Sequence, residues 1–392
     1  MPEIAALPLQ IPTQLRGEFL KNLAYVSESL LAYELDSAGS QVSFELTSGH
    51  ESQAPVVSER IAKVARKLCR SYQAGAGKVV LTGKAQRQPR FNQDPHPLLV
   101  EEGELTRYGR GRYGFGPRMV ALLDYFDRKL TEALLPFQPA HHRFPALVGA
   151  DVLDRCRYIR SFPTALTLTC HVREDMEAIK QFADSATWSG DHLACPQESL
   201  AGVECLLSPT VCFHYYAALA NRELREPRTI TAVGKCFRYE SKNLTGLERL
   251  WDFTMREIVF VGAGDWVLAQ RERTIGLIAP LLDSWDLSYE IRSATDPFFI
   301  EDYSTMAAFQ LGFDLKFEIL APLPYCNKDL AIGSLNYHQD FFGRSFDISN
   351  NGTSQHTGCV GFGLERVALA FLAQHGPDPK AWPASVAKEI VQ

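Results

Sequence analysis

The sequence predicts an α+β fold with a β-hairpin at its centre, helices beside it and a small α/β extension at the N-terminus. Three observations lead to this prediction. Side chains alternate along residues 237–240, and again at every second position from Phe253 to Val259, as in paired strands. Residues 359–373 pass from a glycine-bearing strand into helical spacing. Residues 1–110 contain only short elements, so we divide the chain into an extension of unknown role (1–110) and a larger domain (111–392).

The N-terminal elements follow from local spacing and breakers. We expect them at Gln14–Ala32 (helix), Gln41–Leu46 (strand), Val57–Tyr72 (helix) and Lys78–Thr82 (strand). Residues 86–97 are rich in proline, glutamine and asparagine and predict a loop. A helix with regular apolar spacing then covers Arg118–Leu135.

The hairpin places four functional side chains on one side. Arg238 and Glu240 share a face of the first strand, and Phe253 and Glu257 share a face of the second. An arginine fork can hold a phosphate and an aromatic ring can stack on adenine, while Arg249 in the loop can reach outer phosphates. An ordinary amphipathic hairpin with surface ion pairs is the alternative.

The third stretch carries another arginine. Gly361 and Gly363 end a strand, and Arg366 lies in the first turn of the following helix among apolar neighbours. An arginine in such surroundings needs an anionic partner, because a buried unpaired charge is costly. A phosphate would serve, and so would a structural carboxylate.

Composition limits the classes of protein. With 46% hydrophobic and 22% charged residues the chain is typical of a globular protein, and no apolar run could span a membrane. Nine scattered cysteines without a CxxC pair, and no signal peptide, predict reduced thiols in the cytoplasm. A net charge of −6 without a basic run makes tRNA an unexpected partner.

The hairpin and the 359–366 stretch resemble motifs 2 and 3 of the class II aminoacyl-tRNA synthetases. The resemblance implies an antiparallel sheet flanked by helices that activates an amino acid with ATP and Mg²⁺. Arg238 and Arg366 would be the catalytic phosphate-binding residues, Arg249 and Glu240 would also bind the nucleotide, and Phe253 would stack on adenine. Phe144-Pro-Ala-Leu-Val resembles motif 1, which implies a homodimer.

Cys212, Glu257 and Cys359 resemble the zinc ligands of one subgroup, formed by methanogen-type seryl-tRNA synthetases and amino acid:[carrier protein] ligases. There a zinc ion with three protein ligands binds the substrate's amino group. The alternative for any single cysteine is small apolar filling. Three other cysteines lie close in sequence to Cys212, namely Cys170, Cys195 and Cys205.

Residues 331–344 resemble a seryl-type segment in which Ser334 and Asn336 face the substrate. The glutamate that helps to bind magnesium in that family is replaced here by Leu330, so Asp329 and Glu318 are the remaining candidates.

The extension lacks the helical arm of ordinary seryl-tRNA synthetases, so the ligases are the favoured branch. The resemblance implies activation of glycine, alanine or serine and transfer to the phosphopantetheine thiol of a carrier protein. Residues 270–274 begin a candidate docking helix, or else a solvated charged face. Three alternatives remain: a zinc-dependent seryl-tRNA synthetase, a tailoring enzyme that loads a peptide or amine, and a non-catalytic binding module.

Overall fold

The computed structural model describes residues 2–71, 78–83, 89–244, 246–294 and 314–390. Within these residues a central sheet has eight strands, in the order β4 (Val79–Thr82), β14 (Glu290–Ser293), β15 (Lys316–Leu323), β16 (Lys328–Tyr337), β19 (His356–Gly363), β13 (Asp252–Gly262), β12 (Arg228–Phe237) and β7 (Ala140–His142). Neighbouring strands are antiparallel except β7 and β12, which run parallel. The predicted α+β class with an antiparallel sheet and flanking helices is confirmed.

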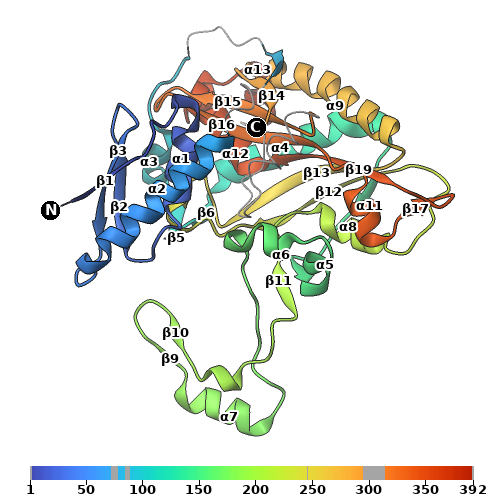
Figure 1. The fold of residues 1–392 in the computed structure, drawn as a ribbon. Helices are drawn as coiled ribbons and strands as arrows, with labels where there is room; N and C mark the ends of the chain where they lie inside the picture. Colours follow the sequence, from blue (N-terminus) through green and yellow to red (C-terminus); the bar gives the residue numbers. More distant parts are fainter. Residues whose placement is uncertain (1, 72–77, 84–88, 245, 295–313, 391–392) are drawn as a thin grey trace.

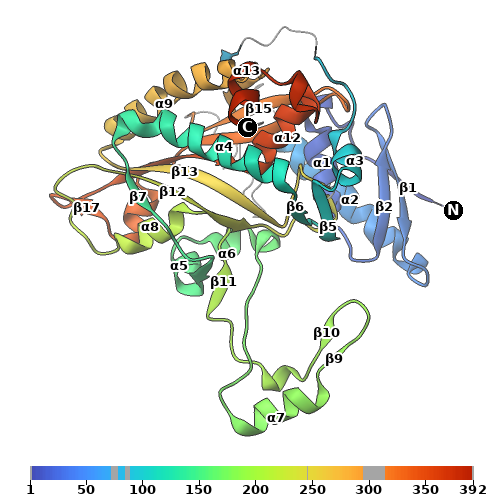
Figure 2. The ribbon, with the colours of Figure 1, turned by 180° about the vertical axis from the view of Figure 1, so that it is seen from behind.

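Three helices cover one face of this sheet: α4 (Pro117–Leu134), α9 (Gly264–Ser284) and α12 (Leu364–His375) (Figures 1 and 2). Alternation along β13 sends Ile258 and Phe260 into this layer, where both are fully buried. The predicted helix at Arg118–Leu135 is α4, and the predicted strand-to-helix passage is β19 followed by α12.

The other face has its own, smaller core at one end. Val259 and Cys359 point to this side, where they are covered by three short helices, α5 (Ala150–Arg155), α8 (Cys212–Ala218) and α11 (Phe341–Phe346). The two faces of the sheet therefore differ in how far helices cover them. A continuous layer of helices lies on one face, and short helices cover only part of the other.

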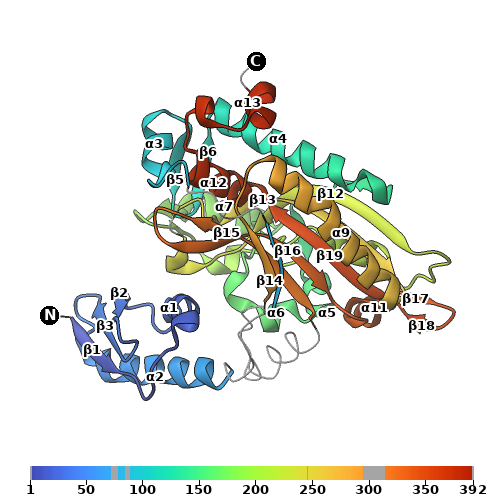
Figure 3. The same cartoon turned by 90° about the horizontal axis from the view of Figure 1, so that it is seen from above.

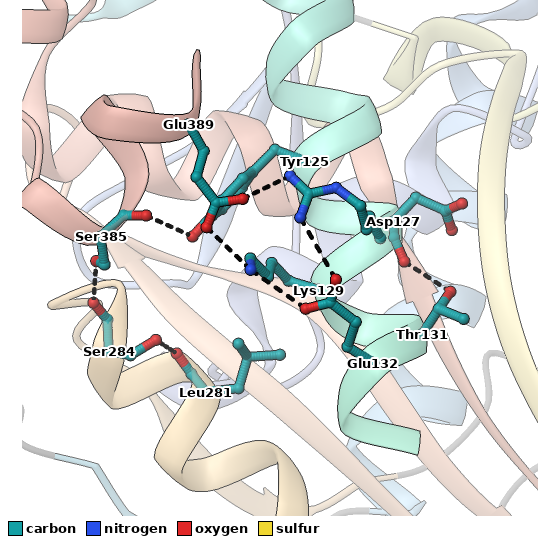
Figure 4. A network of polar contacts seen from close by, with 10 residues as sticks. Tyr125, Asp127, Lys129, Thr131, Glu132, Leu281, Ser284, Ser385 and Glu389 are labelled. Carbon is teal, nitrogen blue, oxygen red and sulfur yellow. Dashed lines mark hydrogen bonds and ion pairs between the residues drawn. The ribbon is translucent and has the colours of Figure 1, made fainter. Parts of the chain in front are cut away.

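The last described helix, α13 (Ala384–Ile390), is fastened to α4 by polar contacts (Figure 4). Glu389 pairs with Arg128 at 2.7 Å and with Lys129 at 2.9 Å. The Tyr125 hydroxyl donates to the carbonyl of Ser385 at 3.2 Å. These contacts hold the C-terminal segment on the helical layer, on the side away from the sheet.

Residues 2–71 form a module with its own apolar core (Figure 3). It comprises β1 (Glu3–Ala6), α1 (Arg16–Leu23), β2 (Leu30–Leu35), β3 (Gln41–Leu46) and α2 (Ala54–Ser71), with the strands in the order β1-β3-β2. We call residues 2–71 the N-terminal module. Residues 79–82, which we had grouped with the extension, instead form β4 and pair with β14 of the central sheet. The apolar core of the N-terminal module ends near residue 69. It therefore does not test the predicted division at residue 110, which stays a prediction.

Two sequence-based boundaries were wrong. The helix predicted over Gln14–Ala32 is α1 alone, because Ser27 and Ser29 hydrogen-bond locally and Leu30 already pairs with β3. In the hairpin, the first strand ends at Phe237, so Arg238 and Glu240 lie beyond it and not within it. Ser241, with a φ of 51°, then turns the chain.

Four smaller segments complete the described structure. α3 (Pro95–Glu101) and the hairpin of β5 (Leu105–Gly109) and β6 (Arg112–Phe115) precede α4. α6 (Tyr158–Ser161) and the pair β8 (Leu147–Gly149) and β11 (Cys205–Leu207) lie below the sheet in Figure 1. An arm with α7 (Met176–Ser185), β9 (Thr187–Trp188) and β10 (Leu193–Ala194) projects away from the body (Figures 1 and 2). Beside α11, β17 (Ser349–Asn350) and β18 (Thr353–Ser354) form a small hairpin.

Candidate active site

Strand register brings the candidate residues to one face of the sheet. Ser334 lies opposite Gly361, and Gly361 lies opposite Glu257, on adjacent strands. Opposite residues of paired strands point to the same face. Position 361 has no room for a side chain, since a Cβ there would lie 2.7 Å from Met255 Cε and 3.4 Å from Glu257 Cγ. We call this part of the sheet face, where Ser334 and Glu257 lie on either side of Gly361, the floor of the site.

Cys212, Glu257 and Cys359 meet at one end of this floor. One potential ligand atom from each lies within 4.8 Å of the others, and all three residues are buried. Cys212 is the first residue of α8, Glu257 lies on β13 and Cys359 on the adjacent β19. Thr210 Oγ1 donates to Glu257 Oε1 at 2.7 Å, and the backbone N–H of Val211 donates to the same oxygen at 3.2 Å. The loop before α8 therefore fixes the carboxylate.

Burial and proximity set the charges of this trio. The hydrogen bond between the thiols raises the pKa of Cys212 and lowers that of Cys359. Burial, followed by the negative charge of Cys359, raises the pKa of Glu257 to about 7. If all three donors were ionised at this distance they would repel one another, so the trio retains protons unless a cation lies between them.

The donor set fits a zinc ion. Two thiolates and one carboxylate are ligands that zinc takes, and three protein ligands leave a fourth position open. Glu257 Oε2 is buried and has no hydrogen-bond partner among the described residues. A bound cation would satisfy this oxygen and remove the repulsion within the trio. The three other cysteines near Cys212 in sequence are not part of this trio. Cys205 lies on β11, and Cys170 and Cys195 lie on either side of α7 in the segment that forms the projecting arm.

Arg238 and Phe253 lie together although they come from different sides of the hairpin. The Arg238 guanidinium carbon is 5.4 Å from the centre of the Phe253 ring, and its Nε donates to the carbonyl of Pro209 at 2.9 Å. The guanidinium has no carboxylate partner among the described residues. Its remaining N–H groups are therefore available to an anionic ligand beside an aromatic ring.

A second group of charges lies around Arg366. This arginine donates to the carbonyls of Glu248 at 2.8 Å and Ala331 at 3.3 Å. Burial, followed by repulsion from Arg249, lowers its pKa to about 10. Glu240 pairs with Arg249, and although burial alone would raise its pKa, the neighbouring arginines hold it below the usual range. The cluster is rich in cations, as a polyphosphate site requires.

Ser334 and Asn336 line the floor as predicted by the alternation of β16. The Asn336 amide donates to Ser334 Oγ at 3.1 Å and to Cys359 Sγ at 3.5 Å. His338 Nε2 lies 3.8 Å from the same sulfur. Sequence reasoning missed His338 and Thr210. In the sequence, only their positions near Asn336 and Cys212 pointed to these two residues. Closeness in sequence does not show where a side chain points.

The structure separates the two magnesium candidates and removes one arginine from the candidate docking segment, which otherwise stays a prediction. Asp329 is exposed at the start of β16, whereas Glu318 lies opposite Ser334 and acts to raise the pKa of Arg366.

In the candidate docking segment at residues 270–274, Arg271 is buried, donates to the carbonyl of Asp314 at 2.5 Å and covers the Phe317 ring at 4.4 Å. Arg271 therefore cannot contact a partner, because packing between α9 and the sheet uses its guanidinium.

Residues 198–375 match the family described as tRNA synthetase class II core domain (G, H, P, S and T). Among curated proteins, the chain is 35% identical over 251 residues to amino acid--[acyl-carrier-protein] ligase 2 of Bradyrhizobium diazoefficiens, covering 62% of this chain and 72% of that protein. Ligase 1 of the same organism is 34% identical, with 69% and 79% covered. The type-2 serine--tRNA ligase of Methanocaldococcus jannaschii is 25% identical, with 80% and 62% covered.

Solved structures support the same fold. M. kandleri SerRS, in its complex with A. aeolicus tRNASec, superposes with a TM-score of 0.70 at 20% identity, covering 99% of this chain and 76% of that one. The seryl-tRNA synthetase of Pyrococcus horikoshii, complexed with ATP, gives a TM-score of 0.57 at 16% identity, with 88% and 83% covered. At these identities the likeness concerns the fold.

Proposed function

Because the chain belongs to the amino acid:[carrier protein] ligases, which have a class II synthetase core, we propose that it activates a small amino acid with ATP and transfers it to a carrier protein. The observation that carries the proposal is the meeting of Cys212, Glu257 and Cys359 on the sheet face that also holds Ser334 and Asn336. In this proposal, the site for the amino group of the amino acid lies beside the site for the phosphates of ATP.

In the first step, a carboxylate oxygen of the amino acid attacks the α-phosphorus of ATP. The new O–P bond forms as the bond to pyrophosphate breaks, which yields aminoacyl-adenylate. Arg238 and Arg366 would stabilise the charge on the phosphoryl oxygens, and Phe253 would stack on adenine. Such a reaction depends mainly on alignment and charge stabilisation, because the protein supplies little covalent chemistry.

The amino-group site would consist of Cys212, Glu257 and Cys359 around a zinc ion, which supplies an open coordination position for a neutral amine. Asn336 and Thr210 would hold the two ligands that they contact in place. Ser334 would contact the substrate beside Gly361. Met255 occupies the space next to this glycine, which favours glycine, alanine or serine over larger substrates.

In the second step, the phosphopantetheine thiol of the carrier attacks the carbonyl carbon of the adenylate, and AMP leaves as the thioester forms. Glu318 is the better candidate for a magnesium contact, since its carboxylate lies near Arg366 and Asp329 is exposed. Its present partner is Lys316, at 3.0 Å, which would have to give way or share it.

We include a homodimer in the proposal. The outer edge of β7 has no partner strand in the part of the chain that the structure describes. The arm exposes large apolar side chains, Met176 at 82% and Trp188 at 67%. Exposed apolar groups of this size favour contact with a second protein surface. Sedimentation of the purified chain as a monomer would remove this part of the proposal.

The search for membrane segments gives no candidate: none of the described helices has the length and apolarity to cross a bilayer. The nine cysteines are all free, which supports our proposal of a reducing compartment such as the cytoplasm.

The first experiment is ATP–pyrophosphate exchange with each of the common amino acids, followed by transfer of the best substrate to holo-carrier protein and to total tRNA. Exchange with a small amino acid and loading of the carrier alone would support the ligase. Serine-dependent exchange with loading of tRNA would replace it with a seryl-tRNA synthetase. If no amino acid supports pyrophosphate exchange, the remaining hypothesis is a non-catalytic binding module.

A further inference from the structure

The N-terminal module touches the loop of the hairpin that carries the nucleotide-binding candidates. Asn243 Nδ2 donates to the backbone carbonyl of Lys21, on α1, at 3.3 Å. The hydroxyl of Tyr25, just after α1, is hydrogen-bonded to Asn243 and Thr164. Helix α1 lies on the side of the module that faces the body (Figure 3). The module is thus fixed against Asn243, in the loop that leads to Arg249.

This contact brings the Lys21 ammonium into the cation cluster. Burial, followed by repulsion from Arg249, lowers the pKa of Lys21, while Glu18 and Glu240 act in the opposite direction. Even so, 44% of its side chain is accessible. The Lys21 side chain is therefore partly enclosed by protein atoms and partly accessible, and it is close enough to Arg249 for the two charges to repel.

Carboxylates within the protein do not balance these cations. Glu240 pairs with Arg249, and Lys21 has a single loose contact with Glu18 at 4.0 Å. Among the described residues, Arg238 and Arg366 donate hydrogen bonds to backbone carbonyls and not to carboxylates. A cluster of cations of this kind is stable when a polyanion binds between them.

We infer that the N-terminal module is part of the nucleotide site, and that Lys21 binds the β- or γ-phosphate of ATP. The inference rests on the proposed function and extends it to residues 2–71. The outer phosphates are the expected ligands because the Asn243 contact holds α1 against the loop that carries Arg249, the residue expected to reach those phosphates. Lys21 would hold the pyrophosphate group while the α-phosphorus reacts at Arg238. Asn243 is a positioning residue, since it acts through α1 and the loop.

The alternative is a structural lysine that only pairs with Glu18 on the surface of α1. Such i,i+3 pairs on a helix stabilise it very little and have no effect on a distant ligand. The two possibilities differ in nucleotide affinity. A phosphate-binding lysine distinguishes ATP from AMP, which lacks the outer phosphates, and a structural lysine does not.

The test uses the full chain with Lys21→Met, Lys21→Arg and a control, Lys63→Met, whose lysine is exposed on α2 of the same module. Affinities for Mg-ATP and for AMP are measured by calorimetry without amino acid, and KM values by pyrophosphate exchange. We expect K21M to lose about tenfold in ATP affinity, the factor typical of a lost charged hydrogen bond. AMP affinity and the KM for the amino acid should stay unchanged, K21R should recover most of the loss, and K63M should match the parent.

Equal affinity of K21M and parent for ATP would overturn the inference, and so would equal losses for ATP and AMP. If the parent binds ATP but no amino acid supports exchange, the proposed function fails, and the ATP-to-AMP comparison still decides the role of Lys21. If the parent binds no ATP, both proposals fall. Melting temperatures of the variants check that each one is folded.

Discussion

Thr210 donates a 2.7 Å hydrogen bond to Oε1 of Glu257 and so fixes the carboxylate that lies beside Cys212 and Cys359. The threonine precedes α8 and the glutamate lies within β13, so the bond joins a loop to the central sheet. A site held in this way is organised before any ligand arrives, because the donor groups need not move to meet it.

The metal site can be tested by composition. Cys212→Ala and Cys359→Ala each remove one of three donors, so we expect the purified variants to lose the zinc that the parent holds at about one ion per chain. Atomic emission of dialysed protein measures the content. Cys170→Ala, at an exposed position in the stem of the arm, should keep the metal. A parent protein without zinc, or a C359A variant that retains it, would rule out the assignment.

Arg238 can be tested with a substitution that keeps its charge. Arg238→Lys removes the planar fork beside Phe253 but leaves a cation, so two parallel hydrogen bonds to a phosphate are no longer possible. We expect kcat for pyrophosphate exchange to fall by about 100-fold or more, as for the loss of a donor to a charged transition state. Zinc content should not change.

Arg228→Lys is the matched control, because Arg228 is exposed at the opposite end of β12. Near-normal exchange by R238K would mean that Arg238 supports structure and does not contact the reacting phosphate.

Asn336 is expected to act on the amino acid and not on ATP. Its amide donates to both Ser334 and the Cys359 sulfur, so Asn336→Ala removes one hydrogen-bond donor from each of them. We expect KM for the amino acid to rise about tenfold, with KM for ATP unchanged. The exposed Asn92→Ala serves as control. A parallel rise in both KM values would contradict this role.

His375 gives a prediction for stability against pH. It is buried in α12, where Nε2 donates to the carbonyl of Trp285 at 3.1 Å, and burial lowers its pKa. The unfolded chain takes up a proton near pH 6.5 and the folded chain does so only at lower pH. Stability is therefore full above about pH 6.5 and declines as the pH falls toward the folded pKa.

His375→Gln keeps a donor but cannot titrate, so we expect the urea midpoint to change less between pH 7 and pH 5 than in the parent. The exposed His50→Gln is the control. An unchanged pH dependence in H375Q would show that other groups cause the acid instability.

The sequence by itself determined the local features of this protein. Alternation from Phe253 to Val259 predicted β13, and apolar spacing predicted α4 and α12. The same stretches offered Arg238, Glu257 and Arg366 as candidates, because the residue types that bind phosphates and metals are few, and their roles stay predictions. The strand and helix predictions succeeded because strand alternation and helical spacing depend on neighbours in the chain.

Only the tertiary structure decided which distant residues meet. Cys212 joins Cys359 because β19 pairs with β13 and α8 packs beneath them, and a list of nine cysteines could not specify that pairing. Arg271 looked available on a charged helix, yet packing against Phe317 buries it. Lys21 carried no signal at all, since its place beside Arg249 depends on how the N-terminal module sits on the catalytic region. Long-range packing, which local pattern does not encode, assembles the site.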